Sequence, residues 1–158
     1  MIKLTERLSH QEDNQKNEFA NAISSTLSLP IDMRVRSRVK VKLDDGREAG
    51  LFLDRGSLLR GGDLLRSAEG DVIKILAAKE KVSSVYCDNG LQLAKAAYHL
   101  GNRHVPLQVE SNFLRYQHDQ VLDDMLIQMG LEVIIELASF EPEAGAYLQT
   151  SAGHHHHD

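Results

Sequence analysis

The sequence predicts an α+β fold, with β structure in its first half and a ferredoxin-like arrangement in its second half. Three observations support this prediction. Apolar and polar residues alternate strictly over residues 33–43, which is the period of a half-buried strand. Capped segments with helical spacing occur only after residue 85. Charge also divides the chain, because residues 34–66 carry nine basic and five acidic side chains whereas residues 79–158 carry five and eleven.

The composition is ordinary for a soluble globular protein. Among 158 residues, 42% are apolar and 26% are charged, and the net charge is -5. This acidic balance argues against a general nucleic-acid binder. Apolar runs are shorter than the about 20 residues of a membrane span, the N-terminus has no apolar leader, and Cys87 has no disulfide partner. We therefore expect a cytoplasmic protein that binds neither nucleic acid nor membranes.

The first half is expected to consist of strands joined by turns. Four segments have the alternation of strands, namely residues 2–8, 33–43, 48–53 and 72–78. Asp44-Asp45-Gly46 favours a tight hairpin turn between the second and third of them. The polar stretch over residues 10–25 has no such pattern and is expected to be a loop.

Basic residues occupy one face of the strand expected over residues 33–43. They are Arg34, Arg36, Arg38, Lys40 and Lys42. Because strand side chains alternate between two faces, we expect all five to be exposed together. One interpretation is a solvated face that protects an edge strand from aggregation. The other is a docking surface for an acidic partner, whose association complementary charge would speed.

The second half has the element order β-α-β-β-α-β, which is that of the ferredoxin-like fold. Strands are expected over residues 82–86, 105–109, 113–118 and 131–137. Asp88 or Asn89 is expected to cap a helix that ends near His99. Asp119 is expected to cap a second helix, which Gly130 ends.

The common catalytic and nucleotide-binding motifs are missing from the sequence. There is no His-Glu-x-x-His, Cys-x-x-Cys or Gly-x-Ser-x-Gly, and Gly61-Gly62 lacks the lysine of a phosphate-binding loop. Asp123 and Asp124 form a carboxylate pair, but adjacent helical residues point about 100° apart and cannot share one proton. We interpret both as part of a solvated helix face and expect no enzyme.

A run of four histidines, His154, His155, His156 and His157, is the strongest compositional feature. Imidazoles bind nickel, copper and zinc, and a flexible chain lets several of them reach one ion. The other interpretation is a purification tag. Tags commonly carry about six histidines, whereas this run has four and is followed by Asp158, which favours a native metal-binding tail.

Two further histidines, His104 and His118, lie beside helix ends. His99 precedes His104 by five residues, or about 140° around a helix, so these two do not chelate one ion together. As a metal ligand, His104 would need partner ligands from another subunit, from the second strand or from the tail. A lone histidine in a loop is more often structural, and the same ambiguity applies to His118.

Six segments carry a recognisable pattern. They are AYHLGNRHVPLQ (97–108), LRYQHD (114–119), VLDDM (121–125), DDGREAG (44–50), LLRGGD (58–63) and FEPEAGAY (140–147). Together they resemble the UreE family of urease accessory proteins over nearly the whole chain, apart from residues 10–25. The resemblance implies three parts. Residues 1–78 would be an all-β domain like the peptide-binding module of chaperones, residues 79–140 a ferredoxin-like metal-binding domain, and residues 141–158 a flexible histidine-bearing tail.

The resemblance also implies a nickel metallochaperone. Members are homodimers that deliver nickel for the dinickel site of urease, together with the accessory GTPase UreG and the urease pre-activation complex. His104 matches the nickel ligand at the dimer interface, one from each subunit, and His118 matches a second-site ligand. Some members have another histidine two residues later, where this chain has Gln120. His99 matches a family histidine of minor role.

Several alternatives stay open on sequence grounds. Zinc or copper are candidate ions besides nickel, because imidazole suits all three. A nickel storage or buffering protein would bind the same ion without a handover partner. An RNA- or peptide-binding module that uses the basic strand is a further alternative, which salt-dependent RNA binding would favour.

Overall fold

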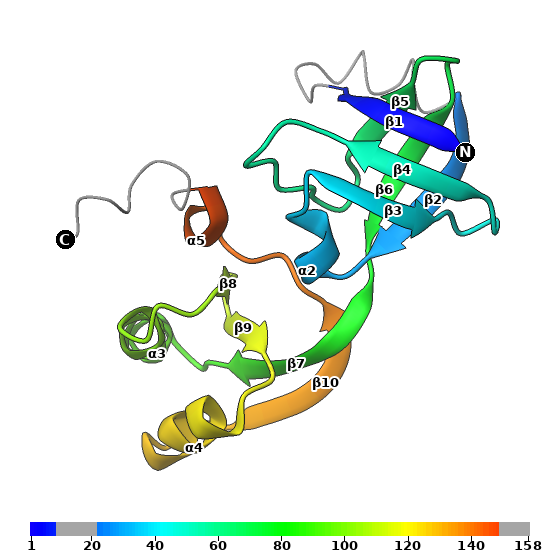
Figure 1. Cartoon of the computed structure of the whole chain (residues 1–158). Helices are drawn as coiled ribbons and strands as arrows, with labels where there is room; N and C mark the ends of the chain where they lie inside the picture. The colour runs from blue at the N-terminus through cyan, green and yellow to red at the C-terminus, as the bar shows by residue number, and fades with distance from the viewer. Residues whose placement is uncertain (9–21, 149–158) are drawn as a thin grey trace. The chain divides into compact units, whose positions relative to one another are not determined.

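The structure, a computed structural model, describes residues 1–8 and 22–148. The chain divides into two compact units, of which the first is Met1–Ala77 and the second begins at Ala78 (Figure 1). The predicted fold class, α+β with a β domain followed by a ferredoxin-like domain, is confirmed. Among the described helices, none is long and apolar enough to cross a membrane.

The N-terminal unit is a six-stranded sheet with one short helix. Its elements are β1 (Ile2–Arg7), β2 (Ile23–Leu29), α2 (Ile31–Arg34), β3 (Arg38–Lys42), β4 (Glu48–Phe52), β5 (Leu64–Ser67) and β6 (Val72–Ala77). The strand order is β2-β6-β5-β1-β4-β3, in which β1 pairs with β4 and β2 with β6 in parallel and the other pairs are antiparallel. The apolar face packs into one core, which includes Leu4, Leu27, Leu51, Leu65 and Ile73.

Local sequence signals account for much of this sheet. The strands expected over residues 2–8, 48–53 and 72–78 correspond to β1, β4 and β6 and are confirmed. The hairpin between β3 and β4 closes where the Leu43 amide donates to the Arg47 carbonyl at 2.8 Å. Gly46 has φ +95°, a conformation that costs glycine little and other residues much more.

The strand expected over residues 33–43 is wrong in its first part. Residues 31–34 form α2 directly after Pro30, which fits the start of a helix, and β3 begins only at Arg38. Arg34 is fully buried, and its Nε and Nη1 atoms donate to the carbonyls of Leu29 at 3.0 Å and Leu59 at 3.1 Å. Arg34 therefore does not belong to an exposed basic face. Its charge satisfies two buried backbone acceptors instead.

Sequence reasoning missed two strands of this unit, β2 and β5. Residues 23–25 of the expected loop belong to β2, which pairs with β6 along its length, while residues 9–21 lie outside the described part. The alternation of Leu27 and Leu29 with polar residues was the available signal for β2. β5 has only four residues, too few for a periodic pattern to stand out.

The C-terminal unit has the predicted β-α-β-β-α-β order. Its elements are β7 (Lys79–Tyr86), α3 (Gly90–Gly101), β8 (Gln108–Val109), β9 (Phe113–Gln117), α4 (Gln120–Gln128), β10 (Val133–Ser139) and a last turn of helix, α5 (Gly145–Leu148). The antiparallel sheet has the order β10-β7-β9-β8, as in ferredoxin-like domains. Val85 and Leu114 from the sheet share a core with Leu100 and Leu126 from the helices, so α3 and α4 cover one sheet face.

Both predicted helix caps are confirmed. The Asn89 side chain accepts from the Gln92 amide at 2.9 Å, and the Asp119 carboxylate accepts from the amides of Val121 and Leu122. α3 continues two residues beyond the expected end at His99. These caps fix where each helix begins, and α4 thereby starts directly after β9.

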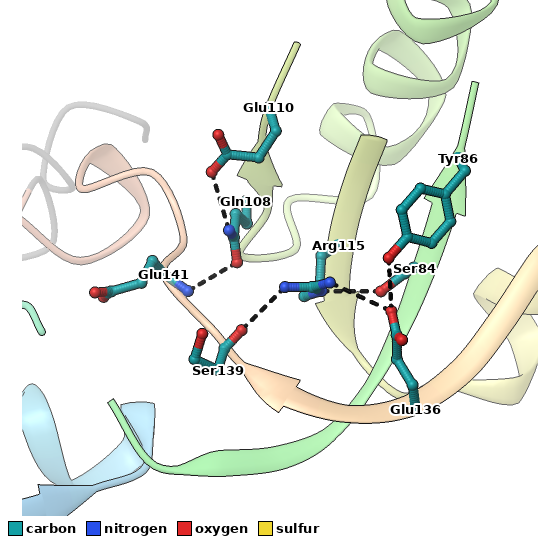
Figure 2. Close-up of polar contacts among 8 residues, drawn as sticks. All are labelled: Ser84, Tyr86, Gln108, Glu110, Arg115, Glu136, Ser139 and Glu141. Carbon is teal, nitrogen blue, oxygen red and sulfur yellow. Dashed lines mark hydrogen bonds and ion pairs between the residues drawn. The ribbon is translucent and has the colours of Figure 1, made fainter. Parts of the chain in front are cut away.

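The other face of the C-terminal sheet carries a polar network centred on Arg115 (Figure 2). Its guanidinium donates to Ser84 Oγ at 2.9 Å, to the Ser139 carbonyl at 3.2 Å and to Glu136 Oε2 at 3.3 Å. The Tyr86 hydroxyl donates to the same Glu136 oxygen at 3.0 Å. The hydrogen bond from Ser84, followed by those from Tyr86 and Arg115, holds the pKa of Glu136 below its ordinary value of 4.5. The network ties β10 to β7 and β9.

A second set of contacts holds the segment after β10. The Gln108 amide group donates from Nε2 to Glu110 at 3.0 Å and accepts from the Glu141 backbone amide at 2.9 Å (Figure 2). The Glu143 amide donates to the Leu107 carbonyl at 2.8 Å. The chain between β10 and α5 is therefore bound beside β8.

Candidate metal-binding site

His104 lies in the turn that follows α3. The amides of Arg103 and His104 donate to the carbonyls of Leu100 and Gly101, each at 3.0 Å, so the turn closes the C-terminal end of the helix. His104 is exposed, and with φ +56° it is the one non-glycine residue with positive φ in the described part of the chain. Residues in this region cost of order 1 kcal/mol or more and cluster at functional sites. The turn presents the imidazole to solvent.

The helix before this turn carries exposed apolar side chains. Leu91 and Tyr98 are each 65% exposed, and their spacing of seven residues places them on one side of α3. The His99 ring contacts the Tyr98 ring edge-on, with centroids 5.2 Å apart. Exposed apolar side chains on one side of a helix are suited to contact with another protein surface.

His118 lies at the end of β9, at the edge of a buried polar cluster. Its Nδ1 atom is 3.1 Å from Ser83 Oγ and 3.2 Å from Asp123 Oδ2. The His118 side chain is 20% exposed and that of Asp123 only 2%. The cluster joins β7, β9 and α4 on the face of the sheet that the helices cover.

Asp123 is anchored on its other oxygen by Tyr116. The Tyr116 hydroxyl donates to Asp123 Oδ1 at 2.6 Å. Burial and, next, this hydrogen bond raise the pKa of the Tyr116 phenol far above its ordinary value of 10. The phenol therefore stays protonated and acts as a donor at neutral pH.

The expectation of a solvated helix face is wrong for Asp123, whereas Asp124 is exposed as expected. The signal that sequence reasoning missed is the position of Asp123 on the inward stripe of α4. Leu122, Asp123 and Leu126 are the buried residues of that helix, and Leu126 follows the other two by four and three residues, which places all three on one face. A carboxylate within an apolar stripe indicates a buried partner.

Within the described part of the chain, the candidate ligands do not meet. In residues 1–8 and 22–148 no group of three or more histidine, cysteine, aspartate or glutamate side chains could hold a metal ion. His104 and His118 follow different elements, and the run His154–His157 lies outside the described residues. Burial raises the pKa of the Cys87 thiol, which disfavours the thiolate that binds metals. Each exposed imidazole is thus a single donor that needs ligands from elsewhere.

The N-terminal unit has a separate surface feature, a groove of about 790 Å³ that we call the basic groove. It is lined by Val35, Arg36, Ser37, Arg38, Leu53, Asp54 and Arg55. The Leu53 amide donates to the Ser37 carbonyl at 2.8 Å and joins its two walls. The three arginines are exposed and form no ion pair with any described residue, whereas Lys40 lies 3.5 Å from Glu48.

Comparisons with known proteins give matches along the chain. The family description "UreE urease accessory protein, N-terminal domain" matches residues 4–78, and that of the C-terminal domain matches residues 80–158. The urease accessory protein UreE of Tolumonas auensis is 57% identical over 154 residues, which cover 97% of this chain and 79% of that protein. UreE of Citrobacter koseri is 60% identical over 143 residues, covering 90% and 94%. UreE of Alcanivorax borkumensis is 53% identical over 159 residues, covering 98% and 89%.

Proposed function

The chain belongs to the UreE family of urease accessory proteins, which are chaperones of urease maturation and not enzymes, and from that premise we propose that it carries nickel. It binds nickel ions in the cytoplasm and delivers them for assembly of the dinickel site of urease. The nickel is cargo, so the protein must both hold the ion and release it.

The observation that carries this proposal is the exposed imidazole of His104 in its positive-φ turn. A structural metal site is closed by four protein ligands, whereas a site with few protein ligands keeps open positions. One His104 from each of two chains leaves such positions for water or for ligands of a receiving protein. An incomplete site of this kind exchanges its ion, which a carrier requires.

The need for a second imidazole beside His104 leads us to expect a dimer. The turn offers one imidazole, His104, and the helix α3 that precedes it exposes the apolar side chains of Leu91 and Tyr98. We expect two copies to associate through this region and to share nickel between their His104 side chains. Metal binding and association would then stabilise each other.

His118 and the tail histidines are the secondary nickel ligands. With Gln120 two residues after it, His118 has no neighbouring imidazole on its own segment. His154, His155, His156 and His157 would add capacity and pass ions to the tighter site. Zinc and copper suit the same imidazole donors and would compete with nickel.

The expected handover partners are the GTPase UreG and the urease pre-activation complex. The basic groove, whose Arg36, Arg38 and Arg55 are exposed and form no ion pair with a described residue, is suited to an acidic surface of such a partner. A nickel storage protein would need no handover partner. Nickel-dependent co-purification of purified UreG with the chain separates these two functions.

Equilibrium dialysis against nickel tests the binding proposal. His104→Ala should abolish the tightest site, one ion per two chains, because it removes both shared ligands. His99→Ala is the matched control, since His99 is equally exposed and lies five residues away. Circular dichroism should give the same fold for both variants. An unchanged tight site in His104→Ala would refute the role of His104.

A further inference from the structure

Asp123 is a buried carboxylate with one oxygen unexplained. Oδ1 accepts from Tyr116, but Oδ2 is buried and has no hydrogen-bond donor among the described residues. Nδ1 of His118 lies 3.2 Å from Oδ2, which is within ion-pair distance but not aligned for a direct hydrogen bond. A carboxylate placed between Leu122 and Leu126 is costly unless a partner compensates it. Its position therefore needs a reason beyond packing.

We propose that Asp123, together with Ser83, fixes the orientation and the tautomer of His118, so that the ring offers only its Nε2 atom to a nickel ion. The inference deepens the proposed function and rests on it for the identity of the ion. Asp123 is a positioning residue in this scheme. It does not touch the metal.

The contacts around His118 are compatible with a proton on Nδ1. The Tyr116 hydroxyl donates to Asp123 Oδ1 at 2.6 Å, which leaves Oδ2 as the carboxylate oxygen beside His118. Ser83 Oγ lies 3.1 Å from Nδ1 of His118, and a hydroxyl oxygen can accept the proton on that nitrogen.

The opposite tautomer is electrostatically unfavourable. Without its proton, Nδ1 would direct a lone pair into a buried site where Oδ2 of Asp123 lies 3.2 Å away. Two lone-pair acceptors this close repel each other, and little water is present to screen them. With its proton, Nδ1 brings a positive hydrogen beside the carboxylate. The Asp123 carboxylate therefore favours a proton on Nδ1.

A proton on Nδ1 leaves the other ring nitrogen, Nε2, available to a metal ion. In the Nδ1–H tautomer, Nε2 carries the free lone pair, and no described residue bonds to it. A metal-binding histidine usually donates the N–H of its other ring nitrogen to a carboxylate, a carbonyl or water. This contact orients the ring and makes the metal-binding nitrogen more basic. The other carboxylates of this region have different roles. Asp119 caps α4, and Asp124 is exposed and accepts from Gln120 at 2.9 Å.

The test uses the full chain labelled with nitrogen-15 at histidine, without metal. Long-range proton–nitrogen NMR should give the Nδ1–H tautomer for His118. In Asp123→Asn, which replaces the negative charge beside Nδ1 with a neutral amide, the share of the Nε2–H tautomer should rise. Nickel affinity at His118, measured in a His104→Ala background truncated after Gly153, should fall about 10- to 100-fold. Asp124→Asn is the matched control and should change neither quantity.

A second variant separates Asp123 from Ser83. In Ser83→Ala the negative carboxylate still lies beside Nδ1, so the Nδ1–H tautomer should persist. An Nε2–H tautomer in the wild type, or an unchanged tautomer in Asp123→Asn, would overturn the inference. A tautomer that responds as expected while nickel leaves the His118 signals unperturbed would keep the positioning role. That outcome would refute instead the assignment of His118 as a nickel ligand.

Discussion

Single residues of this chain are defined as much by their buried partners as by their own chemistry. Asp123 and Asp124 are adjacent and identical, yet one accepts from Tyr116 inside the domain and the other faces solvent. Arg34 and Arg36 differ in the same way, since only Arg34 is fully buried. Sequence periodicity assigns a face to each residue only when the element itself has been identified correctly.

Glu136 gives a prediction about pH at this scale. Its folded-state pKa lies below 4.5 because Ser84, Tyr86 and Arg115 stabilise the carboxylate. A lowered pKa adds stability that is present above the unfolded value and is lost as pH falls through the folded value. Glu136→Gln should therefore lower the free energy of unfolding near pH 7 by up to about 1 kcal/mol, with a smaller difference near pH 3.

Urea unfolding at the two pH values measures this difference. The exposed Glu132, four residues earlier, gives the matched control variant Glu132→Gln. A deficit of Glu136→Gln that stays constant or grows on acidification would contradict the stabilisation of its carboxylate.

At the scale of elements, the accuracy of the sequence predictions follows from how local each signal is. Caps and turns depend on a few adjacent residues, so Asn89, Asp119 and Gly46 were interpreted correctly. The helix α2 replaced a predicted strand because Pro30 and the buried partners of Arg34 outweigh the alternation. Those partners come from β2 and from the loop after β4, which the alternation over residues 33–43 does not contain.

The candidate site also has parts that depend on local signals and a part that depends on distant residues. The turn position of His104 and the strand-end position of His118 could be predicted, because the first follows the end of one helix and the second precedes the cap of the next. The cluster around His118 could not. It needs β7 and β9 in register, with Ser83 opposite Tyr116, and α4 packed above them.

Arg34 provides a prediction for the N-terminal unit. Arg34→Met keeps the length of the side chain but leaves the carbonyls of Leu29 and Leu59 without the donors that they have now. Leaving a buried acceptor unsatisfied costs about 1–3 kcal/mol. We therefore expect Arg34→Met to lower the free energy of unfolding by about 2–5 kcal/mol.

The control for Arg34 is Arg36→Met, two residues away. Arg36 is exposed, so this change should stay within about 0.5 kcal/mol. Urea unfolding followed by circular dichroism gives both values. Equal effects of the two substitutions would contradict a structural role for the buried guanidinium.

At the scale of the whole molecule, the chain consists of two units with separate cores. The exposed candidate ligand His104 lies in the C-terminal unit, and the exposed arginines of the basic groove lie in the N-terminal unit. We therefore expect metal binding and partner docking to be separable by substitution. The two surfaces differ in the sign of the charge that they attract.

The double substitution Arg36→Glu with Arg38→Glu tests that separation. It reverses two charges of the basic groove, so association with an acidic partner should slow, while nickel binding should stay unchanged. Association rates of the wild type should also fall as salt rises. Lys40→Glu with Lys42→Glu is the matched control, because these residues do not line the groove. Normal urease activation by the groove variant would contradict the docking surface and leave the interpretation of a solvated basic face.

The central claim, that the chain hands nickel to urease through His104, is tested most directly by transfer itself. Nickel-loaded chain is mixed with UreG and metal-free urease, with a chelator that holds free nickel below the concentration that activates urease unaided. Urease activity is then measured over time. We predict activation by the wild type and by His99→Ala, and loss of most of it with His104→Ala at equal protein concentration. Equal activation by His104→Ala would contradict the claim.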